Sequence, residues 1–171
     1  MVAVVGVVGT LLSALLTQRA ADRSRRREQE RVEEVRERRR HAQDLRACYV
    51  ALNTSARQYL AALTDQVHAL GRDEELRTVR QRLTEARDQY RDVYAEAQLR
   101  MPDRVLGLVG GLSHDLGALY GMVRRLDDGV PRAGDSPAAV RDGIDELWGR
   151  LRRMRREMRS ELGAFRADSG R

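Results

Sequence analysis

The stretch "VLGLVGGLSHDLGALYGMVRRL", Val105 to Leu126, decides the fold class, because its large apolar side chains recur at alternating spacings of three and four residues. That spacing places them on one side of an α-helix. The seam consists of Val105, Val109, Leu112, Leu116, Leu119, Val123 and Leu126. The stretch also contains five glycines. Each of them weakens a helix by roughly 1 kcal/mol relative to alanine, so their positions need an explanation.

A second stripe lies opposite this seam on a helical wheel. It consists of Gly107, Gly110, His114, Gly117 and Gly121, again three or four residues apart. We expect this glycine stripe on the outside of the fold and interpret it as an interaction face. Close approach of another helix is one explanation for it. The others are exposure of the backbone and His114 to a ligand, and a tolerated weakness that lets the helix bend.

Three further seams with the same spacing lie on either side of this one. The first consists of Leu45, Tyr49, Leu52, Ala56, Tyr59, Leu63 and Leu70. The second consists of Leu76, Val79, Leu83, Ala86, Tyr90, Val93 and Ala97. The last consists of Val140, Ile144, Leu147, Leu151, Met154, Met158, Leu162 and Phe165. Together the four seams predict helices over about 41–70, 73–100, 103–127 and 137–166.

Residues typical of helix ends separate the seams. Gly71 suits the end of the first helix, Asp73 can cap the second, and Pro102 follows the end of the second. Ser136 and Pro137 suit the cap and first position of the last helix. Because the connections are short and no strand pattern competes, residues 41–171 predict an all-α, up-down-up-down four-helix bundle.

The N-terminal residues predict a transmembrane helix over 1–18. The run "MVAVVGVVGTLLSALLT", Met1 to Thr17, has no charged side chain and spans about 26 Å as a helix, at the short end of what crosses a membrane. A secretory signal peptide and a buried soluble helix are the alternatives. A signal peptide would carry positive charge before the run and a small-residue cleavage site after it, and neither is evident.

Positive charge follows the apolar run directly. The arginines concerned are Arg19, Arg23, Arg25, Arg26 and Arg27. Arginine on this flank predicts an N-terminus outside and a C-terminal domain in the cytoplasm, with the guanidinium groups at anionic lipid headgroups. Within the span, Gly6, Thr10 and Ala14 recur every four residues, a spacing that lets two membrane helices pack closely.

Residues 19–40 predict a charged helical stalk. They contain ten arginines and six acidic residues, many of them three or four positions apart. The chain's net charge of +6 is therefore concentrated beside the apolar run, whereas a nucleic-acid binder carries basic and aromatic residues across a folded face. We expect no nucleic-acid partner. The later Arg-rich stretch "GRLRRMRREMRS", residues 149–160, is interpreted as a solvated face or as a surface toward lipid.

No pattern of residues indicates catalysis. Cys48 is the sole cysteine, so no disulfide forms within the chain, and His41, His68 and His114 do not share a metal-ligand spacing. Phosphate loops, dinucleotide fingerprints and nucleophile elbows are absent from the sequence. We therefore predict no enzyme activity, no catalytic residue, no cofactor, no metal and no small-molecule substrate.

Two resemblances to known proteins follow from these residues. The segment "SHDL", Ser113 to Leu116, resembles the phosphoacceptor segment of sensor histidine kinases, and a histidine outside a four-helix bundle resembles histidine-phosphotransfer domains. The kinase segment continues with Arg and Pro, whereas Gly117 and Ala118 follow here, and the lysine of the phosphotransfer pattern is missing. This resemblance implies a signalling component that uses an exposed His114.

The second resemblance covers about the first third of the chain. The stretches "VVGVVGTLLSALLTQR" and "RRRHAQDLRACYVALNTSARQYLAAL", with the stalk between them, are similar to small, single-span helical proteins of actinobacteria, mostly of unknown function. We expect a membrane-anchored cytoplasmic scaffold that forms a homo-oligomer or recruits a protein partner. The phosphotransfer component is the alternative.

Overall fold

The computed structural model describes the backbone of residues 3–70 and 76–168 and the side chains of residues 27–70 and 76–163. The described chain is all-helical, as predicted, with no strand. The elements in order are α1 (Ala3–Ala69), α2 (Leu76–Arg100), α3 (Asp103–Asp127) and α4 (Pro137–Asp168). The chain divides into two compact units, Met1–Ala42 and Gln43–Arg171.

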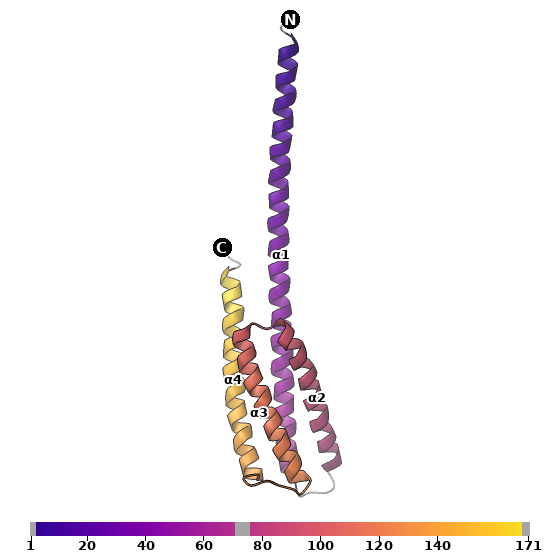
Figure 1. The fold of residues 1–171 in the computed structure, drawn as a ribbon, viewed down its shortest axis with the longest axis vertical. Coiled ribbons are helices and arrows are strands. Elements are labelled where there is room, and N and C mark those ends of the chain that lie inside the picture. The colour runs from indigo at the N-terminus through magenta and orange to yellow at the C-terminus, as the bar shows by residue number, and fades with distance from the viewer. Residues whose placement is uncertain (1–2, 71–75, 169–171) are drawn as a thin grey trace. The chain divides into compact units, whose positions relative to one another are not determined.

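The unit Gln43–Arg171 contains the end of α1 together with α2, α3 and α4. Figure 1 shows these helical segments side by side, each running opposite to the one before it. Short connections make this arrangement natural, because a chain that leaves one helix end re-enters the bundle at the same end.

The core of this unit follows the predicted seams. Buried side chains from all four helices form one hydrophobic cluster. The six seam residues of α3 from Val105 to Val123 are all buried, and the six of α4 from Val140 to Met158 are too. On α2 only every second seam residue is buried, and Val79, Ala86 and Val93 are half-buried. Leu70, Leu126 and Leu162 near the helix ends are half-buried, and Phe165 lies outside the described side chains.

Helix α1 buries a wider face than its predicted seam. The additional buried side chains are Cys48, Ser55, Leu60, Ala62, Gln66, Val67 and Ala69. A core-facing helix of a globular bundle commonly buries positions beside the central seam as well, because neighbouring helices cover both flanks. The side-chain amide atoms of Gln66 have no hydrogen-bond partner within the described residues.

The start of α4 confirms the sequence prediction. The Ser136 Oγ accepts a hydrogen bond from the Ala139 N–H at 3.0 Å, and Pro137 occupies the first helical position. In the preceding loop, Gly129 and Gly134 have φ angles of 71° and 90°, which glycine adopts without strain. The predicted roles of Gly71 and Asp73 lie outside the described residues.

The predicted membrane helix also lies outside the residues whose side chains are described. That applies to Gly6, Thr10 and Ala14 and to the arginines at 19, 23, 25 and 26, whereas Arg27 is described and exposed. Among the described residues, no helix has a stretch long and apolar enough to span a membrane. The membrane anchor therefore stays a prediction.

Candidate interaction surface

The glycine stripe of α3 lies on the side away from the core. Gly107, His114 and Gly117 are exposed, and Gly110 and Gly121 are half-buried. Two small residues that the stripe prediction left out, Gly111 and Ala118, are exposed as well. A helical wheel could have placed both in the stripe, since each lies within about 60° of His114 at 100° per residue.

The space above the middle of the stripe is open. A methyl group built at Gly107 or Gly117 of the stripe, or at Gly111 beside it, meets no neighbouring atom within 4 Å. No packing within the described chain therefore requires glycine at these positions. The helical backbone at this face is accessible to an approaching molecule.

The other two glycines are partly covered. A methyl group at Gly110 comes 3.6 Å from the Tyr94 Oη of α2, which is an ordinary van der Waals contact. At Gly121 a methyl group comes 3.3 Å from the Arg125 Nη1 of the same helix. The stripe is consequently bounded by α2 beside Gly110 and by the Arg125 side chain beside Gly121.

The "SHDL" segment presents only its histidine freely to solvent. Within the described residues, the exposed His114 imidazole takes part in no hydrogen bond or ion pair, whereas Leu116 is fully buried. Asp115 pairs with Arg150 and thereby links α3 to α4. Ser113 is half-buried beside the Tyr90 hydroxyl.

A cluster of tyrosines joins α1, α2 and α3. The Tyr59 ring centroid lies 5.8 Å from that of Tyr90 and 6.5 Å from that of Tyr120, and Tyr90 stacks on Tyr94 at 6.1 Å. The Arg87 guanidinium lies 4.7 Å from the Tyr120 ring centroid, as a cation–π contact requires. Burial raises the pKa of both Tyr59 and Tyr90, that of Tyr90 to about 12. Because Tyr59 and Tyr90 are buried and the rings contact one another across three helices, we assign the cluster to packing.

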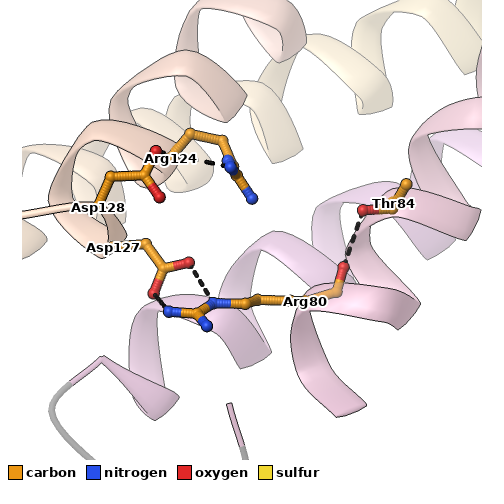
Figure 2. Close-up of polar contacts among 5 residues, drawn as sticks. All are labelled: Arg80, Thr84, Arg124, Asp127 and Asp128. Atoms are coloured by element: carbon orange, nitrogen blue, oxygen red, sulfur yellow. Dashed lines mark hydrogen bonds and ion pairs between the residues drawn. The ribbon is translucent and has the colours of Figure 1, made fainter. Parts of the chain in front are cut away.

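Charged groups tie α2 to the end of α3. The Arg80 Nε donates to Asp127 Oδ2 at 2.6 Å and its Nη2 to Oδ1 at 2.9 Å (Figure 2). The Thr84 hydroxyl donates to the Arg80 carbonyl at 3.0 Å. Arg124 and Asp128 form a looser pair at 3.5 Å. Only the Arg80–Asp127 contact joins two helices, since the other two contacts lie within α2 and at the end of α3. We therefore assign this cluster to the packing of α2 against α3.

Metal-ligating residues do not gather in the described part of the chain. No three side chains of His, Cys, Asp or Glu there are placed to hold a metal ion. Burial raises the pKa of the Cys48 thiol, so it is protonated and a poor ligand or nucleophile at neutral pH.

Comparison with known proteins yields no match. No family model, no curated protein and no solved structure is similar enough to this chain to be matched. Inferences about function therefore rest on the chain's own residues and their geometry.

Proposed function

We propose that this protein is a membrane-anchored cytoplasmic helical scaffold that associates with itself or recruits a protein partner and catalyses no reaction. The uncharged run at 1–17 and the arginines after it support the anchor and its orientation. The exposed glycine stripe of α3 supports association. The phosphotransfer proposal needs only one residue of this surface, whereas the scaffold uses the whole stripe.

The open space above Gly107, Gly111 and Gly117 is the observation that carries the proposal. An exposed helix is more stable with alanine than with glycine, so glycines there cost stability without helping the fold of the chain itself. Small residues at helical spacing let a second helix approach until backbones touch. The lost helix stability is then offset by contacts with the partner.

The variant Gly110→Ala/Gly117→Ala separates a contact surface from a weak helix. Both positions accommodate a methyl group, so the free energy of unfolding should rise by up to about 1 kcal/mol for each substitution. The added methyl groups should hold a partner helix away. Sedimentation of the full-length protein in detergent and pull-down from its own membranes should then show weaker association despite the higher stability.

Gly163→Ala is the matched control. Gly163 is an exposed glycine of α4 with no atom within 4 Å of an added methyl group. The substitution Gly163→Ala should raise the free energy of unfolding about as much as one stripe substitution and leave association unchanged. A double stripe variant that is more stable and associates like the wild type contradicts the contact-surface proposal.

A phosphotransfer role for His114 is the second candidate, favoured by its exposed imidazole. This role is supported if the wild type carries acid-labile phosphate and the variant His114→Gln does not. Histidine phosphate that persists in His114→Gln, or none in cells that express the wild type, counts against it.

A further inference from the structure

The central strip of the outer face of α4 carries its charges in two blocks. Three exposed acidic residues come first along the helix, namely Asp142, Asp145 and Glu146. Three exposed arginines follow, namely Arg152, Arg153 and Arg156. All six lie on the side of α4 away from its buried seam residues Leu147 and Leu151.

The two blocks are arranged symmetrically about Gly149. The pairs found three, four and seven residues before and after it are Glu146 with Arg152, Asp145 with Arg153, and Asp142 with Arg156. Each pair combines one acidic and one basic side chain. In two antiparallel copies of a helix related by a two-fold axis at one residue, a position before that residue lies level with the position equally far after it on the other copy.

These charges are not used within the described chain. None of the six residues forms an ion pair there, although the neighbouring Arg150 pairs with Asp115 of α3. The centre of this face also lacks a side chain, because residue 149 is glycine. A methyl group built at the half-buried Gly149 meets only the Arg152 Nη2, at 3.8 Å. Two helix axes can therefore come close where they cross.

We propose that a second copy of this chain docks on this face, with the two α4 helices antiparallel and Gly149 at their crossing. The acidic block of each copy then lies beside the arginine block of the other copy, with Asp145 next to Arg152 and Glu146 next to Arg153. The two-fold axis forms every such contact twice. A parallel arrangement places like charges opposite one another and is disfavoured. An anionic lipid surface would attract the arginines but repel the acidic block.

This inference deepens the proposed scaffold function by naming a second copy as the partner. It uses a face of α4, whereas the scaffold proposal rests on the glycine stripe of α3. Substitutions on α4 can therefore fail to change association while the stripe substitutions succeed, and the reverse also holds.

Two complementary charge reversals test the pairing. One variant is Asp145→Arg/Glu146→Arg, and the other is Arg152→Glu/Arg153→Glu. Full-length protein is studied in detergent, where the copies are free to associate in either orientation. Each variant alone brings like charges together in the antiparallel dimer, so its dissociation constant in sedimentation should rise at least about tenfold.

An equimolar mixture of the two variants should dimerise like the wild type. Between the unlike copies, arginines at 145 and 146 face glutamates at 152 and 153, and the native contacts remain on the other side of the axis. High salt should weaken the wild-type dimer, because screening shortens the reach of exposed charges to about 3 Å at 1 M ionic strength. The helix content of both variants by circular dichroism should equal that of the wild type.

Gly149→Cys provides a second measurement that does not depend on charge. Mild oxidation should join two copies by a disulfide between their cysteines at 149, because that residue lies on the axis. The variant Ala138→Cys should not form this disulfide, because the exposed position 138 lies beside residue 160 of the other copy and far from the second cysteine. A wild type that is monomeric, a mixture that remains as weak as either variant alone, or equal cross-linking of both cysteine variants overturns the proposal.

Discussion

Single glycines of α3 and α4 have different roles because their surroundings differ. A methyl group at Gly143 of α4 comes 2.7 Å from the Leu119 Cδ2 of α3, so glycine there allows the two helices to pack closely. At Gly107 the same methyl group meets nothing within 4 Å. Glycine at 143 therefore serves the fold, whereas glycine at 107 needs a reason outside the described chain.

Asp135 gives the protein a predictable response to acid. The Arg125 guanidinium donates to both of its carboxylate oxygens, at 2.6 and 2.9 Å, and the Arg132 backbone N–H donates at 2.9 Å. The hydrogen bonds from Arg125 contribute most to lowering the Asp135 pKa from 3.8 to about 2. A carboxyl group whose pKa is lowered by folding stabilises the fold above its unfolded pKa, and this contribution is lost as the pH falls.

We predict that the free energy of unfolding falls as the pH drops from 3.8 to about 2, as measured by urea titration. Asp135→Asn should be less stable than the wild type near neutral pH and should lose less stability over this interval. Equal losses in the two proteins would show that the Arg125 pair does not shift this equilibrium.

At the level of helices, the Arg80–Asp127 pair should couple α2 to α3. The contact is bidentate, and the Asp127 side chain is only 2% exposed while that of Arg80 is 45% exposed. Bidentate pairs are stronger than single surface ion pairs, so a double-mutant cycle with Arg80→Ala and Asp127→Ala should give a coupling energy of about 1 kcal/mol in urea unfolding.

Arg124 and Asp128 provide the matched control within one turn. They are four residues apart, their side chains are half-exposed, and the Arg124 Nη2 lies 3.5 Å from the Asp128 Oδ2. Their coupling energy should therefore be about 0.3–0.5 kcal/mol. Equal coupling energies in the two cycles would mean that the contact between α2 and α3 gives no advantage over an ordinary surface pair.

For the whole molecule, the most direct test of the proposed membrane anchor is the location of the protein in the cell. The full-length protein should resist carbonate extraction from membranes, because the run from Met1 to Thr17 contains no charge. A reporter fused after Arg171 should be active in the cytoplasm. Deletion of residues 1–18 should release a highly helical protein into the soluble fraction. A reporter active only outside the cell would reverse the orientation, and a β-rich spectrum of the released protein would contradict the bundle.

The sequence contains enough information for the helices and their buried sides. Seam residues such as Val109, Leu116 and Leu151 are fully buried, because a spacing of three and four residues is a local property of one helix. The Ser136 cap is equally local, since its hydrogen bond reaches only to Ala139. The outward position of His114 follows from the same wheel.

The contacts between helices depend on the tertiary structure. Arg80 and Asp127 are 47 residues apart, and no sequence pattern identifies them as partners. The Tyr94 hydroxyl beside Gly110 and the Leu119 side chain against Gly143 likewise depend on how far each helix is rotated and shifted along its neighbour. The seam pattern determines which side of each helix is buried, because it is periodic along one chain segment. Rotation and shift arise only when four such sides pack together, so the tertiary structure alone decides which exposed residues meet and which stay open.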